Sequence, residues 1–139
     1  MHDITIGGKQ CQAVGNLFLL DNTCKAAVIV RRRYSDATFL QLKQKWLVVG
    51  EAGGVLVSAA IASREKDVLR EAMERGYNII LLRENGFPLL YKPAGEAFNA
   101  CAQGVLLQIS PWQYHMERQK ISRAQCLELN TLAQSIIQE

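Results

Sequence analysis

The sequence predicts an α/β fold, with a doubly wound, mostly parallel sheet (Rossmann-like) that follows an N-terminal β-hairpin. Two patterns support this class. Short runs of apolar and β-branched residues alternate with longer segments in which apolar residues recur every three or four positions. The apolar runs lack polar alternation, as expected for parallel strands covered on both faces. Right-handed crossovers between such strands give a sheet with helices on both sides.

The chain has 139 residues, a length that suits one domain with a single core. We expect a hairpin and lead-in at residues 1–24 and an α/β core at residues 25–139. No apolar run approaches the roughly 20 residues of a membrane helix. The first residues have neither the basic nor the apolar stretch of a secretory signal. We therefore expect a cytoplasmic protein that does not enter a membrane.

The N-terminal segment predicts a hairpin. Ile4–Ile6 and Gln10–Val14 alternate in polarity on either side of a Gly-Gly pair, which suits a tight turn. The apolar patch Leu17–Leu20 follows, and we expect it to cover an edge or a face of the sheet. Ala26–Val30 has the composition of the first buried strand.

Strands and helices alternate through the rest of the chain. The later predicted strands are Val55–Val57, Asn78–Leu82 and Val105–Ile109. The predicted helices run from Ser35 to Gly50, from Ser63 to Gly76, from Pro93 to Gln103 and from Ser122 to Ile137. Serines at three of these starts are typical N-caps. Trp46 shares the apolar stripe of the first helix, so a core position is favoured over an exposed stacking platform.

Cofactor and metal motifs are absent. The chain contains neither GxGxxG nor GxxxxGK[ST], which argues against a dinucleotide-binding or P-loop protein. The four cysteines show no CxxC spacing, so we expect small apolar side chains and no zinc site. We predict no cofactor and no metal.

Positive charge is concentrated in the first part of the chain. The net charge is +3, and residues 1–50 hold seven of the 16 Lys and Arg but three of the 13 Asp and Glu. The excess comes mostly from Arg31-Arg32-Arg33, directly after the first predicted strand. Such a basic face suits phosphate or nucleic acid, and it equally suits a solvated surface.

The candidate site is the edge of the sheet where the parallel strands end. Loops that leave the carboxyl ends of strands gather there, and open α/β sheets bind ligands at that edge. Helix N-termini offer free N–H groups to phosphate, and arginine can grip phosphate with two hydrogen bonds. The candidate phosphate- or DNA-binding residues are Arg31, Arg33, Ser35, Ser58, Ser63, Arg83 and Arg123. The alternative is that the serines only cap helices or close turns.

Nothing in these loops predicts catalysis. They contain no obvious pair of carboxylates, and His115 has no partner that the sequence suggests. We therefore predict no catalytic residue and favour binding over catalysis.

Four segments of the core resemble the Rossmann-like domain of the DNA-processing protein A family (DprA, also called Smf). Ala27–Ser35 resembles the family's first strand and Gly-Ser-Arg turn, and Gly54–Ser58 resembles its second strand and Ser-Gly turn. Asn78–Gly86 and Gly104–Ser110 resemble two later strands with their loops. The resemblance covers about residues 25–137 and implies a diverged, stand-alone relative.

Members of that family bind single-stranded DNA in a basic pocket and form dimers. The resemblance therefore implies single-stranded DNA as partner, a possible homodimer, and site roles for Arg33, Ser58 and Arg123. The sequence departs from the family at two turns, where Arg31 and Ala59 stand in place of glycines.

Three functions stay open. The first is a DprA-like protein that binds single-stranded DNA or another phosphate-bearing ligand at the strand ends. The second is a nucleotide-phosphate-binding protein or enzyme of a related Rossmann-like family, although the Gly-Gly-x-Gly-Thr motif of the phosphoribohydrolases is absent. The third is an interaction module that has lost its ligand, because side chains in place of the turn glycines block close approach of a phosphate.

Overall fold

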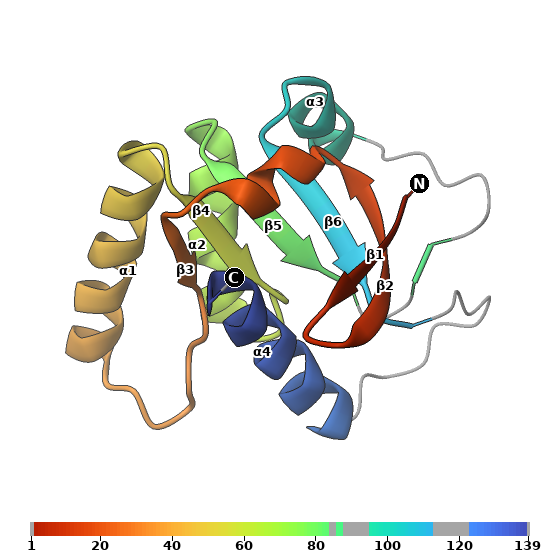
Figure 1. Ribbon diagram of the computed structural model, residues 1–139. Helices are drawn as coiled ribbons and strands as arrows, with labels where there is room; N and C mark the ends of the chain where they lie inside the picture. Colours follow the sequence, from red (N-terminus) through yellow and green to blue (C-terminus); the bar gives the residue numbers. More distant parts are fainter. Residues whose placement is uncertain (1, 84–85, 88–94, 113–122, 139) are drawn as a thin grey trace.

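The computed structural model describes residues 2–83, 86–87, 95–112 and 123–138 (Figure 1). Its strands are β1 (His2–Ile6), β2 (Lys9–Gly15), β3 (Lys25–Ala27), β4 (Val55–Ser58), β5 (Asn78–Leu82) and β6 (Leu106–Ser110). Its helices are α1 (Asp36–Glu51), α2 (Ser63–Glu74), α3 (Glu96–Ala102) and α4 (Arg123–Gln138), with a short 3-10 helix η1 (Leu17–Asp21) after β2. Within the described ranges, no helix is long and apolar enough to cross a bilayer.

The strands form one mixed sheet in the order β1-β2-β6-β5-β4-β3. β3, β4, β5 and β6 are parallel, whereas β2 pairs antiparallel with both β6 and β1. The predicted Rossmann-like α/β class, with a mostly parallel sheet and an N-terminal hairpin, is confirmed. The parallel strands follow one another across the sheet in sequence order, so right-handed crossovers place α1, α2 and α3 on the same face. α4 and η1 cover the other face, so helices flank both sides (Figure 1).

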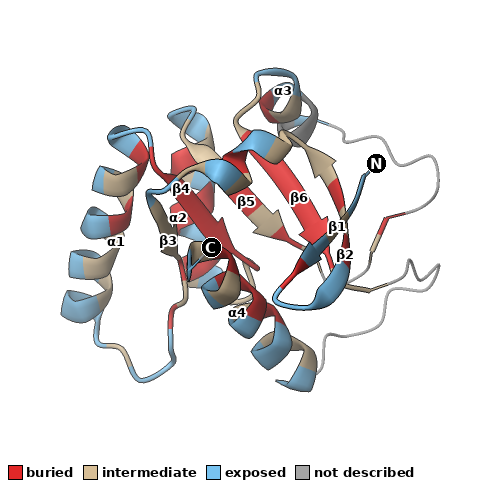
Figure 2. Ribbon diagram, in the orientation of Figure 1, coloured by how far each residue is buried: buried red, intermediate tan, exposed pale blue. Residues whose placement is uncertain are grey.

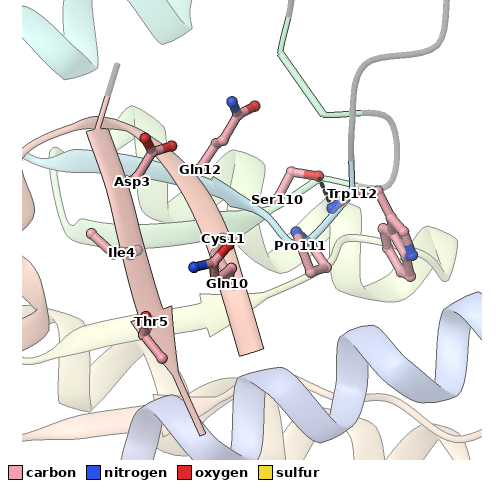
Figure 3. Close-up of a pocket in the computed structure, with 9 residues that line it drawn as sticks. All are labelled: Asp3, Ile4, Thr5, Gln10, Cys11, Gln12, Ser110, Pro111 and Trp112. Carbon is pink, nitrogen blue, oxygen red and sulfur yellow. Dashed lines mark hydrogen bonds between the residues drawn. The ribbon is translucent and has the colours of Figure 1, made fainter. Parts of the chain in front are cut away.

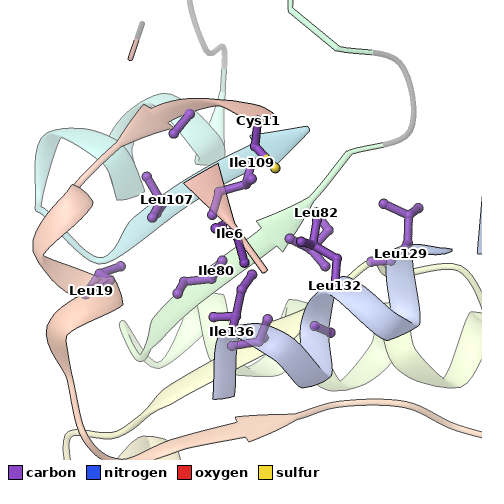
Figure 4. Close-up of a cluster of buried hydrophobic side chains, with 14 of the residues drawn as sticks. Ile6, Cys11, Leu19, Ile80, Leu82, Leu107, Ile109, Leu129, Leu132 and Ile136 are labelled. Carbon is purple, nitrogen blue, oxygen red and sulfur yellow. The ribbon is translucent and has the colours of Figure 1, made fainter. Parts of the chain in front are cut away.

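Two apolar clusters hold these layers together. On one face, Leu56 and Ile79 pack with Val68 of α2. On the other, Ile80 and Ile109 lie in the cluster that includes the inner side of α4 (Figure 4). The central strands are therefore buried on both faces (Figure 2), which explains their apolar runs without alternation. The core position predicted for Trp46 is also confirmed, because its side chain is 8% exposed.

The hairpin turn is formed by Gly7 and Gly8, as predicted. Both residues have positive φ, at 56° and 79°, and a two-residue turn that joins twisted strands requires this conformation at both positions. Ile6 and Lys9 pair across the turn. Ile6 and Cys11 point into the α4-side cluster, which anchors the hairpin on the body of the domain.

β3 is shorter than the predicted strand Ala26–Val30. The Val28 N–H still donates to the Val57 carbonyl at 2.8 Å. At Val30, however, the backbone N–H donates to Glu65 Oε2 at 2.8 Å and not to the neighbouring strand. A side chain of α2 therefore ends this strand.

Three predicted helix starts need comment. Ser35 is the N-cap of α1 as predicted, but Ser63 is the first helical residue of α2 and Ala62 occupies the cap position. The prediction of Ser63 as the N-cap is therefore wrong, and the N–H of the cap residue Ala62 donates to Glu65 Oε1 at 3.4 Å. The predicted start at Ser122 lies outside the described residues.

The four cysteines are free and differ in exposure. Cys11 is buried, Cys24 is exposed, and Cys101 and Cys126 are half-buried. Burial raises the pKa of the Cys11 thiol above its ordinary value. Because the thiolate is the reactive form, a raised pKa and poor access both slow modification.

We expect iodoacetamide at pH 8 to modify Cys24 first and Cys11 last. Peptide mass spectrometry over a time course measures the four rates separately. Modification of Cys11 at the rate of Cys24 would show that the hairpin does not stay docked on the sheet.

Candidate functional site

A groove of about 580 Å³ opens at the edge of the sheet where the parallel strands end. Its walls come from the segment after β3, the turn between β4 and α2, and the first turns of α4. The lining residues are Val30, Arg32, Ile61, Ala62, Glu65, Arg123, Cys126 and Asn130. We call this feature the strand-end groove.

Two arginines line the groove from segments far apart in the sequence. Arg32 lies in the tight turn after β3, which the Tyr34 N–H closes by donating to the Arg31 carbonyl at 3.1 Å. Arg123 is the first residue of α4. Both side chains are exposed, and neither forms an ion pair or a hydrogen bond with another described residue. The groove therefore offers two guanidinium groups to an anion.

The neighbouring arginines of the turn lie outside the lining. Arg31 and Arg33 are exposed on the same turn as Arg32, and Ser35 follows them as the N-cap of α1. The Ser35 Oγ accepts a hydrogen bond from the Thr38 N–H at 3.1 Å, so it serves the helix. The sequence pointed to the turn that lines this groove but not to Arg32, because nothing in a run of three arginines tells which one faces the groove.

Ser58 is used inside the fold. Its side chain is fully buried, and its hydroxyl donates to the Val28 carbonyl at 2.9 Å and accepts from the Ala60 N–H at 3.1 Å. These bonds join the ends of β3 and β4. The predicted contact of Ser58 with a ligand stays a prediction, and its hydroxyl is not part of the groove lining.

Two other candidates are separate from the groove. Arg83 Nη1 donates to the buried Gln108 Oε1 at 3.1 Å, which ties the end of β5 to β6. Ser63 is exposed at the start of α2 and is not among the lining residues. Of the predicted site residues, only Arg123 lies on the groove itself.

Glu65 is the most constrained polar group of the groove. Its side chain is 3% exposed. Oε2 accepts from the Val30 N–H at 2.8 Å, and Oε1 accepts from the N–H groups of Ile61 at 3.0 Å and Ala62 at 3.4 Å. These donors belong to a strand end and a helix start, which are the groups that hold phosphate in many α/β proteins. In this chain the carboxylate of Glu65 already accepts from these three N–H groups.

Sequence reasoning missed this role of Glu65. The available signal was its position in the first turn of α2, where a glutamate often closes a capping box. That pattern predicts the bond to the turn, but it does not predict the bond to Val30 on another strand.

Arg64 holds the turn that carries Arg32. It forms an ion pair with Asp36, and its Nη1 donates to the Tyr34 carbonyl at 3.3 Å. Its guanidinium also lies 4.9 Å from the centre of the Phe39 ring. Arg64 therefore links the start of α2 to the start of α1 and to the turn that carries the three arginines.

Comparisons with known proteins identify no family for this chain. A scan against protein-family models and searches among curated proteins and solved structures each return no match for this chain. Among the described residues, no three His, Cys, Asp or Glu side chains lie together in a way that would hold a metal ion.

Proposed function

We propose that this protein binds single-stranded DNA through phosphates held in the strand-end groove. The observation that carries the proposal is the position of Arg32 and Arg123 on one groove, both exposed and neither paired with another described residue. Exposed guanidinium groups that have no internal partner are suited to phosphate oxygens. Arg31 and Arg33 on the same turn extend the positive charge along the edge.

Glu65 favours a nucleic-acid strand over a terminal phosphate. The backbone N–H groups of Val30, Ile61 and Ala62 already have a carboxylate as acceptor. A phosphate monoester carries close to two negative charges and would have to sit beside that carboxylate. A phosphodiester carries one charge, and the arginines on the walls can hold it further out. The half-buried apolar side chain of Ile61, on the wall of the groove, can contact the sugars.

The sequence resemblance to the DNA-processing protein A family supports the same ligand. In this chain the proposed contacts come from Arg32 and Arg123, while Arg33 has a supporting role on the adjacent position of the turn. The homodimer that the resemblance implies stays a prediction.

We expect Arg32→Ala and Arg123→Ala each to weaken binding of single-stranded DNA several-fold at low salt. Each substitution removes about one phosphate contact, so each should also reduce the slope of log affinity against log salt by about 0.7. Fluorescence anisotropy with a labelled oligonucleotide of about 16 nucleotides measures both quantities. Arg70→Ala is the matched control, because Arg70 is an exposed arginine of α2 that pairs with Asp67.

The anisotropy assay, together with a thermal-shift assay, separates the three functions that the sequence leaves open. A flat curve for the wild-type protein at low salt would overturn the proposal. A rise in melting temperature with mononucleotides but not with DNA would favour the nucleotide-binding alternative, since a ligand that binds only the folded state stabilises it. No effect of either ligand would favour an interaction module.

A further inference from the structure

The outer side of α1 carries apolar side chains that no other described element covers. Leu40 and Val48 are 60% and 57% exposed. Gln44 lies between them at the four-residue spacing that places side chains on one face of a helix, and Leu47 is half-buried at the border of this face. The exposed residues of α1 lie on the side that faces away from the sheet (Figure 2). We call Leu40, Gln44, Leu47 and Val48 the α1 stripe.

The inner side of α1 is apolar as well. Trp46 is buried in the cluster that holds the helix on the sheet, and Phe39 and Leu42 pack against the same cluster. A helix with apolar residues around most of its circumference is usually buried on all sides. Exposed apolar side chains that are neighbours on one face mark an interaction site. The α1 stripe therefore indicates that a partner covers this side of the helix.

Other exposed parts of the described chain do not form a comparable stripe. Phe18 and Leu127 are also strongly exposed, but they lie singly on η1 and α4. The hollow of about 490 Å³ between the hairpin and the end of β6 is lined by exposed polar residues, Asp3, Thr5 and Gln10 among them (Figure 3). α1 thus differs from the other described elements, because it carries two strongly exposed large apolar side chains on one face.

The two ends of α1 carry opposite charge. Arg31–Arg33 are exposed just before the helix, whose N-terminus is itself the positive end of the helix dipole. The Asp36 carboxylate in the first turn is already paired with Arg64. Glu51 is exposed in the last turn, which holds no basic residue, and it forms no ion pair with another described residue. Each end of α1 therefore attracts the opposite end of a second α1.

We propose that the α1 stripe binds the α1 stripe of a second copy of this chain, with the two helices antiparallel. A twofold axis at Gln44 places Leu40 of one copy against Val48 of the other, because both lie four positions from Gln44. The same arrangement brings Glu51 to the positive end of the other helix. A parallel pair would place Glu51 beside its own copy and one arginine turn beside the other, which like-charge repulsion disfavours.

The length of α1 limits the strength of this contact. Its 16 residues give a helix about 24 Å long, at about 1.5 Å per residue. Two helices of this length bury less surface than the roughly 1,600 Å² of a standard stable interface. We therefore expect a dimer with a micromolar dissociation constant. The α1 stripe shares no residue with the strand-end groove, so the inference does not rest on the proposed function.

Sedimentation equilibrium without DNA, from about 1 to 500 μM protein, measures the dissociation constant of the dimer. We expect Leu40→Gln/Val48→Gln to raise that constant at least about tenfold, because each substitution removes apolar contact area in both copies. Phe18→Gln/Leu127→Gln is the matched control, since it removes two equally exposed apolar side chains outside α1. We expect the control to dimerise like the wild-type protein. Circular dichroism and thermal unfolding check that both variants fold.

Three results would overturn the inference. The first is a wild-type protein that stays monomeric over the whole range of concentration. The second is an equal dissociation constant in the Leu40→Gln/Val48→Gln variant and the wild-type protein. The third is equal weakening in that variant and the control, which would place the contact on another face of the molecule.

Glu51→Gln tests the orientation of the two helices. In the antiparallel pair the substitution removes an attraction between Glu51 and the positive end of the other helix, so we expect weaker dimerisation by a few-fold at low salt and no difference at high salt. In a parallel pair it would remove a repulsion and tighten the dimer. Tighter dimerisation of Glu51→Gln would therefore overturn the antiparallel arrangement.

Discussion

Replacing Glu65 by alanine should lower the free energy of unfolding by about 3 to 5 kcal/mol, because its carboxylate accepts three hydrogen bonds, and bonds to a charged group contribute about 1.5 to 3 kcal/mol each. The substitution leaves three backbone N–H groups, those of Val30, Ile61 and Ala62, without their acceptor. Each unsatisfied buried donor costs about 1 to 3 kcal/mol. Water that enters from the groove offsets part of this loss, so the three costs do not add fully.

Urea denaturation of wild-type and variant protein measures the loss. Glu74→Ala is the matched control, because Glu74 is an exposed glutamate of the same helix and should change stability by less than about 0.5 kcal/mol. A Glu65→Ala variant that unfolds within about 1 kcal/mol of wild type would show that the three N–H groups find other acceptors.

The same variant tests the idea that Glu65 takes the place of a bound anion. With the carboxylate removed, formate or inorganic phosphate can reach the three N–H groups beside the dipole of α2. We therefore expect these anions to raise the melting temperature of Glu65→Ala by several degrees more than that of wild type. Glu65→Gln should respond less, because its amide still fills the position. Equal anion effects in all three proteins would contradict the role assigned to Glu65.

The fold class was predictable because its signals are local. The apolar runs that became β4, β5 and β6 and the Gly-Gly turn of the hairpin follow from residue type and spacing alone. The end of β3 was not predictable in this way. Val30 belongs to an apolar run, yet its N–H bonds to Glu65, 35 positions along the chain, and no local pattern encodes that contact.

The site was predictable only in outline. The sequence located the arginine turn and Arg123 at one edge, because the ends of parallel strands meet there. The choice of Arg32 over its neighbours depends on the orientation of a turn that Arg64 holds from another helix. The conformation of Ala60 was not predictable either, because its φ of 51° is one that glycine usually adopts. Its N–H bonds to the buried Ser58 hydroxyl, which holds the turn in this conformation.

Gly15→Ala should disrupt the attachment of the hairpin to the sheet, with a loss of about 3 kcal/mol or more, as expected when a special backbone conformation and close packing are violated together. Gly15 pairs with Leu107 at the end of β2 and has a φ of 123°. A Cβ at this position would overlap the Leu106 carbonyl oxygen and lie 3.1 Å from the Leu107 Cα. Both are backbone atoms of a central strand, so neither can move aside without breaking the β6 ladder.

Comparison with Gly8→Ala separates the cost of a positive φ from the cost of steric overlap with the neighbouring strand. Gly8 also has a positive φ, of 79°, but an added Cβ would meet nothing within 4 Å. It should therefore cost only about 1 to 2 kcal/mol, the conformational penalty alone. Chemical denaturation gives the two losses, and hydrogen exchange of the β2 amides locates them. A Gly15→Ala protein no less stable than Gly8→Ala would contradict the close approach of β2 to β6.

The Gly15 variant also tests whether the strand-end groove depends on the hairpin. The groove is built from other segments, and Arg32 and Arg123 keep their positions as long as the parallel strands and α4 stay folded. At a temperature where Gly15→Ala is still folded, we therefore expect single-stranded DNA to bind as it binds to the wild-type protein. Loss of DNA binding in this variant would mean that the hairpin and the groove form one cooperative unit.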